Sequence, residues 1–118
     1  MELFDTTQLG LERALTGSSL RQEAIASNIA NVNTPGYRRQ DVDFQSALQA
    51  AWGQGKDGVS RVSPAVGVDA SSAVRQDGSS VDIDVEAAAQ AKNGLQYEAL
   101  SAVIKTRLSI LRSAMGVQ

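Results

Sequence analysis

Apolar residues at intervals of three and four predict a helix over residues 7–32. This seam has the heptad spacing of a helix that packs lengthwise on another helix. Its apolar members are Leu11, Leu15, Ile25, Ile29 and Val32. The middle of this seam is polar, with Ser18 and Gln22, and includes the run Gly17-Ser18-Ser19. We therefore expect either one helix with a weak centre or a second helix that begins at a Ser19–Gln22 capping box. A functional alternative is that the Ser18 and Gln22 face meets a partner.

A second apolar pattern predicts a long helix over residues 84–114. One stripe at the same spacing consists of Tyr97, Leu100, Ile104, Leu108, Leu111 and Met115. A second stripe beside it consists of Leu95, Ala99, Val103 and Ile110. Asp84 is the candidate N-cap of this helix. Together the stripes are wider than one antiparallel neighbour needs, so we expect spare apolar surface for self-assembly or a partner.

The first helix should end in a joint, which is followed by an arm up to residue 51. Pro35 and Gly36 stand at the second and third positions of Thr34-Pro35-Gly36-Tyr37, as in a type II turn. Asparagine amides near a helix end can bond its unpaired carbonyls or a neighbouring backbone. One asparagine would suffice for that, so three indicate a joint of specified geometry. This signature joint consists of Asn28, Asn31, Asn33, Pro35, Gly36 and Tyr37.

The segment after the joint has less regular patterns. The arm should lead into a short helix from about Phe44 to Ala51. Residues 52–80 hold five of the ten glycines, and their valines are too scattered for a helix. We expect loops, short strands and a small hairpin about Asp77-Gly78, in a segment that is flexible because it buries little apolar surface. The predicted fold is a single, mainly α domain (residues 1–118), in which the two long terminal helices pack as an antiparallel, coiled-coil-like pair around an irregular loop and short-β middle.

Composition removes several kinds of chemistry from consideration. The 118 residues include no cysteine and no histidine, so thiolate sites, disulfides and histidine acid–base catalysis are excluded. The net charge of −2 is spread along the chain, which does not favour nucleic-acid binding. Asp82, Asp84 and Glu86 resemble the start of a calcium loop, but Ala87 stands where that loop needs glycine, and helix capping explains these acids more simply. We expect no enzyme activity, cofactor, metal or small-molecule substrate.

The sequence also shows no pattern of a membrane-spanning helix or of a cleaved signal peptide. No apolar run approaches the roughly 18 residues of a membrane-spanning helix. The first ten residues, MELFDTTQLG, show neither a basic nor an apolar signal region, so we expect no cleaved secretory signal peptide.

Several segments resemble one family of bacterial proteins. Residues 26–37, ASNIANVNTPGY, resemble the N-terminal signature of flagellar rod and hook proteins. Residues 38–48, RRQDVDFQSAL, residues 77–100, DGSSVDIDVEAAAQAKNGLQYEAL, and residues 104–115, IKTRLSILRSAM, narrow the resemblance to the proximal rod type of the flagellar basal body. The matched segments cover most of both ends of the chain.

The resemblance implies a structural subunit of a hollow axial shaft that crosses the periplasm, transmits torque and serves as the export channel. Such subunits leave the cytoplasm through the flagellar type III export apparatus without signal cleavage. The implied partners are other copies, other rod subunits, a basal-body adaptor protein, the membrane ring and the export gate. On this basis subunit packing is assigned to Leu11, Leu15, Ile25, Ile29, Tyr97, Leu100, Ile104, Leu108, Leu111 and Met115. The alternative is a small helical chaperone or adaptor of the export system, which would need a stable dimer with a cargo groove.

Overall fold

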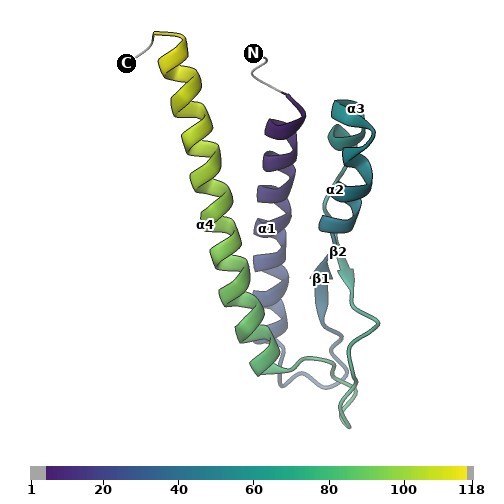
Figure 1. The fold of residues 1–118 in the computed structure, drawn as a ribbon. Coiled ribbons are helices and arrows are strands. Elements are labelled where there is room, and N and C mark those ends of the chain that lie inside the picture. The colour runs from purple at the N-terminus through teal and green to yellow at the C-terminus, as the bar shows by residue number, and fades with distance from the viewer. Residues whose placement is uncertain (1–4, 117–118) are drawn as a thin grey trace.

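Two long antiparallel helices form the body of the chain in a computed structural model that describes residues 5–116. Helix α1 (Thr6–Ala30) runs away from the end at which α4 (Ile83–Ala114) finishes, and the two helices lie side by side (Figure 1). Between them the chain forms β1 (Gln40–Val42), α2 (Gln45–Trp52), α3 (Gly55–Ser60) and β2 (Val66–Val68). The expected mainly α fold with a paired set of terminal helices is therefore confirmed.

Helix α1 is one uninterrupted helix. It passes through Gly17-Ser18-Ser19 without a break, so the alternative of a second helix starting at Ser19 is wrong. Its polar middle faces α4 of the same chain, where the Asn93 amide donates to the Ser18 carbonyl at 2.9 Å and to Gln22 Oε1 at 3.0 Å. A buried asparagine in a helical seam favours one register over others, because a shifted register would leave its amide unpaired.

The glycines of α1 are the places where a second helix approaches it. A Cβ atom at Gly17 would come within 2.4 Å of the Phe44 ring, and one at Gly10 within 2.4 Å of the Trp52 ring. These two aromatic side chains stand at the two ends of α2, so the two glycines, seven residues apart, form notches that let α2 lie against α1. Ala24, Val42 and Phe44 form the buried centre of this contact.

The middle of the chain contains more regular secondary structure than its sequence indicates. Strand β1 pairs with β2 in an antiparallel register that sets Gln40 opposite Val68. The expected hairpin about Asp77-Gly78 is wrong, because those residues form a turn, with φ of 84° at Gly78, and no strand flanks it. Helix α3 also contradicts the expectation that no helix forms here. Its six residues are too few to show a helical period, and Val59 is buried nonetheless.

The molecule is elongated and thin. Its dimensions are 61 × 30 × 14 Å, and its radius of gyration of 17.5 Å exceeds the roughly 13.5 Å of a compact chain of this length. Its accessible surface of 7305 Å² compares with about 6,100 Å² for a compact monomer of this mass. Within residues 5–116, no helix combines the length and the apolar character needed to cross a bilayer.

Candidate assembly site

The end of α1 is closed by Asn31. Its backbone N–H donates to the carbonyls of Ser27 and Asn28, at 3.1 and 3.2 Å. Its side-chain amide donates to the Ser27 carbonyl at 2.8 Å and accepts from the Thr34 hydroxyl at 3.1 Å. The Asn31 side chain therefore adds a second hydrogen bond to a carbonyl of the last helical turn and holds the first residue of the following turn.

The turn that follows has the expected geometry. The N–H of Tyr37 donates to the Thr34 carbonyl at 3.2 Å, and Gly36 has φ of 76°, which suits glycine at the third position of a type II turn. The Tyr37 hydroxyl lies 2.9 Å from the hydroxyl of Ser27, so the arm returns to α1. The N–H of Gly36 also donates to the Asp77 carbonyl at 2.9 Å. Pro35 and Asn33 are exposed, and Asn33 makes no side-chain hydrogen bond to the residues that the structure describes.

Asn28 has a different structural role from Asn31 and Asn33. Its side chain is fully buried and pairs with the backbone of Gln40, donating to the carbonyl and accepting from the N–H, both at 2.8 Å. The same amide nitrogen donates to Glu86 Oε2 at 3.2 Å. Asn28 thus joins α1 to the arm and to the start of α4, with each side-chain polar atom in use.

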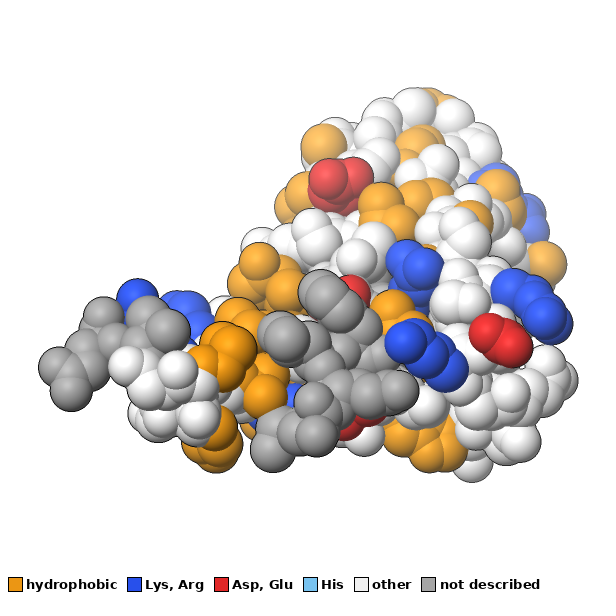
Figure 2. All heavy atoms as spheres, turned by 90° about the horizontal axis from the view of Figure 1, so that it is seen from above, with side chains coloured by type: hydrophobic (Ala, Val, Ile, Leu, Met, Phe, Trp, Pro, Cys, Tyr) orange, Lys and Arg blue, Asp and Glu red, His pale blue; other side chains and the backbone are white. Residues whose placement is uncertain are grey.

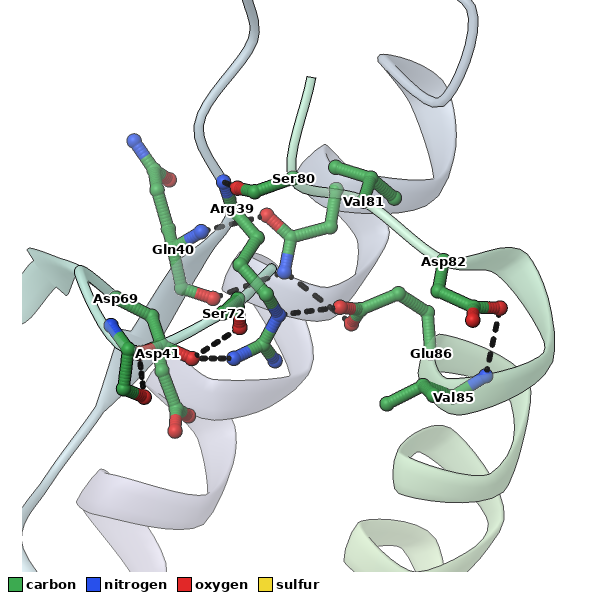
Figure 3. A network of polar contacts seen from close by, with 12 residues as sticks. Arg39, Gln40, Asp41, Asp69, Ser72, Ser80, Val81, Asp82, Val85 and Glu86 are labelled. Atoms are coloured by element: carbon green, nitrogen blue, oxygen red, sulfur yellow. Dashed lines mark hydrogen bonds and ion pairs between the residues drawn. The ribbon is translucent and has the colours of Figure 1, made fainter. Parts of the chain in front are cut away.

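Arg39 lies between Glu86 and Asp69 at the centre of a network of polar contacts (Figure 3). Its Nε atom donates to Glu86 Oε1 at 2.6 Å, and its Nη1 atom donates to Asp69, which follows β2. The Glu86 side chain is 0 % exposed. Because an unpaired buried carboxylate is costly, Glu86 holds Arg39 and Asn28 in place, and three segments of the chain meet there.

Asp69 is held in its charged form. Its carboxylate accepts from the Ser71 hydroxyl at 2.6 Å and from the Ser72 hydroxyl at 2.7 Å. These bonds, the N–H of Ser71 and Arg39 hold the pKa of the Asp69 carboxyl well below its usual range. The fold therefore favours the ionised group that Arg39 requires.

The three acids near the start of α4 have separate roles. Asp82, not Asp84, is the N-cap, and its carboxylate accepts from the N–H of Asp84 at 3.0 Å. The expected cap at Asp84 is wrong because the helix already begins at Ile83. Glu86 turns inward to Arg39, whereas Asp84 is exposed. Residues two apart on a helix point in nearly opposite directions, so the three acids do not share a face as they would on a strand.

Sequence reasoning missed the network of Arg39, Asp69 and Glu86. The partners of Arg39 lie 30 and 47 residues further along the chain, so no local pattern joins them. One signal was present, because Glu86, Asn93 and Leu100 follow one another at intervals of seven residues. That phase places Glu86 on the face of α4 that packs on α1.

The predicted stripe on α4 divides into an inner and an outer part. Leu111 is buried against the body of the chain, and Leu100 and Ile104 are half-buried. Tyr97, Leu108 and Met115 are 42 %, 48 % and 60 % exposed. Figure 2 looks along the helices and shows hydrophobic side chains on the surface beside the C-terminal end of α4. On α1, Ile25 is buried and Leu11, Leu15 and Ile29 are half-buried, so part of the predicted packing set is occupied within the chain.

An apolar groove of about 610 Å³ lies between α2 and α4. Ala14 and Ser18 of α1 form its floor. The walls are formed by Phe44, Leu48 and Trp52 on one side and by Ala99, Leu100 and Val103 on the other, and the remaining lining residues are glutamines. No residue that lines the groove is charged, which suits contact with an apolar surface.

Comparisons with known proteins agree on one family. The family described as "Flagella basal body rod protein" matches residues 11–38, which run from the first half of α1 through the signature joint. The flagellar basal body rod protein FlgB of Escherichia coli (strain K12) is 36 % identical, over 86 % of this chain and 90 % of the relative. FlgB of Bacillus subtilis (strain 168) is 30 % identical over 98 % and 97 %. FlgB of Salmonella typhimurium is 34 % identical over 82 % and 83 %.

Proposed function

From the premise that this chain belongs to the flagellar basal body rod proteins of the FlgB type, we propose how its surfaces serve that assembly. The chain is a structural subunit of the rod, the axial shaft of the basal body. Our proposal is that the two terminal helices pack against neighbouring subunits. Helix α4 contributes the outer part of its apolar stripe to this contact. The observation that carries it is the exposure of Tyr97, Leu108 and Met115 on a helix whose other face is already packed.

The thinness of the molecule supports packing by neighbours. A chain that extends only 14 Å in its smallest dimension, against 61 Å in its longest, arranges its helices in a thin layer and cannot cover both faces of them. Buried hydrophobic residues are correspondingly few and small, with Phe44 the one aromatic side chain among those in the described residues. In a rod, neighbouring subunits would supply the missing cover and so add the hydrophobic stabilisation that the single chain lacks.

The signature joint supports a mechanical role in this proposal. Asn28, Arg39 and Glu86 fix the end of α1, the arm and the start of α4 relative to one another through side chains with little exposure. A shaft that transmits torque needs subunits whose elements keep their relative orientation under load. Bonds between segments far apart in the sequence supply that resistance, because twisting the arm away from α4 would leave buried polar groups unpaired.

We also propose the finer placement and the partners. The subunit would lie in the proximal part of the periplasm-spanning rod, next to other rod subunits, the adaptor protein, the membrane ring and the export gate. It would leave the cytoplasm through the flagellar export apparatus without a cleaved signal peptide. The absence of cysteine suits this route, because no disulfide can form before assembly. The alternative of an export chaperone has no support among the relatives, which are rod proteins.

Complementation of a strain that lacks the gene tests this proposal. The chain with Leu108→Glu should be exported but should fail to enter isolated rods, because a charge would be buried in the packing surface. Ser109→Glu is the matched control, since Ser109 is an exposed neighbour outside the stripe. It should support rods and swimming. Normal rods and swimming with Leu108→Glu would contradict the proposal, as would swimming by the deletion strain alone.

A further inference from the structure

We infer that copies of this chain associate head to tail, with an apolar ridge on α4 of one copy seated in the α2–α4 groove of the next. The ridge consists of Tyr97, Leu108 and Met115. The groove is the apolar hollow of about 610 Å³ described above, with Leu48 and Val103 on its opposite walls. The inference rests on the proposed function, because it takes a second copy of the chain as the partner and specifies the two faces that meet.

The ridge and the groove lie on opposite sides of α4. An α-helix turns by about 100° per residue, and Asn93 marks the direction of α1. From that direction Val103 lies about 80° to one side, whereas Tyr97 and Leu108 lie about 40° and 60° to the other. One copy therefore cannot place its own ridge in its own groove, and each surface needs a different molecule to cover it.

The choice of occupant follows from the number of uncovered surfaces. If two copies met groove to groove, one contact would cover both grooves, but both ridges would stay in water. Ridge in groove covers both kinds of apolar surface with one repeated contact. Such a contact joins different patches on the two copies and leaves a free ridge at one end and a free groove at the other, so it propagates into an open helical array unless the rotation happens to close a ring.

The exposed surface area of the chain fits a subunit that has one neighbour on each side. The accessible surface exceeds that of a compact monomer of the same mass by roughly 1,200 Å². A protein–protein interface of standard size buries about 800 Å² on each partner. A copy in a head-to-tail array contributes its ridge to one contact and its groove to another, so the excess is on the scale of what two modest contacts cover. The groove requires no charge to be desolvated, because its lining is uncharged.

Engineered cysteines test this arrangement cleanly, because the chain has none of its own. Leu108→Cys marks the ridge and Leu48→Cys marks the groove. The two variants, carrying tags of different size, are mixed as purified protein and also co-expressed in the deletion strain, and both samples are treated with a short thiol cross-linker. We expect a mixed cross-linked dimer at least 10-fold more abundant than either self-linked dimer, and a ladder of oligomers from a chain that carries both substitutions.

Ser109→Cys is the matched control, since Ser109 is exposed on α4 but points away from both surfaces. With Leu48→Cys it should give at least 10-fold less mixed product than Leu108→Cys gives. Self-linked Leu48→Cys dimers as the main product would overturn the inference in favour of a groove-to-groove pair. Absence of the mixed product from both samples would also overturn it, and if the unsubstituted chain still builds rods, the proposed function stands. Mixed product from a chain that never enters rods would instead contradict the proposed function.

Discussion

The three asparagines of the signature joint should differ sharply in their effect on stability. Asn28→Ala removes three hydrogen bonds from a side chain that is 0 % exposed. It leaves the N–H and C=O of half-buried Gln40 and one oxygen of fully buried Glu86 without their partner. Each unpaired buried group costs about 1–3 kcal/mol, and water entering the small cavity offsets part of that. We expect a loss of about 3–5 kcal/mol in the free energy of unfolding.

The other two positions supply the comparison. Asn31→Ala removes two hydrogen bonds at a half-buried helix end, so the loss should be about 1 kcal/mol. Asn33→Ala changes an exposed side chain with no hydrogen bond to the described residues, so the change should stay within about 0.5 kcal/mol. The expected order of destabilisation is therefore Asn28, then Asn31, then Asn33, although the three residues look equivalent in the sequence.

Urea unfolding followed by far-ultraviolet circular dichroism measures this order. Asn28→Asp is a second variant of nearly unchanged shape, which loses both donor bonds and places a negative charge beside Glu86. It should destabilise the chain at neutral pH by at least as much as Asn28→Ala. Equal unfolding free energies for Asn28→Ala and Asn33→Ala would refute the reasoning, because the buried contacts would then contribute nothing that an exposed asparagine does not.

Two further predictions concern other parts of the fold. Gly17→Ala should destabilise the packing of α1 by about 1–3 kcal/mol, because the added Cβ would come within 2.4 Å of the Phe44 ring. Gly94→Ala should stabilise α4 by about 0.5–1 kcal/mol in the same unfolding measurement, because a Cβ at Gly94 would meet nothing within 4 Å. Asp69 has a lowered pKa in the fold against about 3.9 in the unfolded chain, so its stabilising effect is complete above about pH 4 and is lost as the pH falls further. The difference in unfolding free energy between the unsubstituted chain and Asp69→Asn should accordingly shrink as the pH is lowered from 6 to 3, and a constant difference would contradict this account.

The two long helices were predictable because their signal is repeated many times along each helix. Leu11, Ile25, Leu100 and Leu111 keep the three- and four-residue spacing, and one unfavourable glycine at position 17 does not outweigh it. The turn at Pro35-Gly36 was predictable for a different reason, since both residues have narrow conformational preferences that fit one turn type. In both cases the information lies within a few residues of the element it specifies.

The remaining elements depend on contacts between distant segments. Strand β2 has only three residues and pairs with β1, which ends 24 positions earlier, so the Asp77-Gly78 turn signal pointed to the wrong hairpin. The sequence likewise presents Gly17 as a weak point of the helix, whereas the position of Phe44 shows why a side chain is excluded there. Helix α3 is too short to carry a period of its own.

The candidate site has a polar part and an apolar part. This difference explains how the chain combines a weak core with a defined shape. Polar residues that pair with one another, such as Asn28, Arg39 and Glu86, are concentrated where α1, the arm and α4 meet. Apolar residues left uncovered, such as Leu108 and Met115, lie along the outer length of α4. Hydrogen-bonded pairs are strict about geometry, whereas apolar contact is permissive about its partner. In the proposed assembly, the joint would set the angle between elements inside each subunit, and the uncovered apolar residues of α4 would supply the association energy. A substitution at Asn28 should thus alter the shape of the subunit, and one at Leu108 should alter its affinity for neighbours.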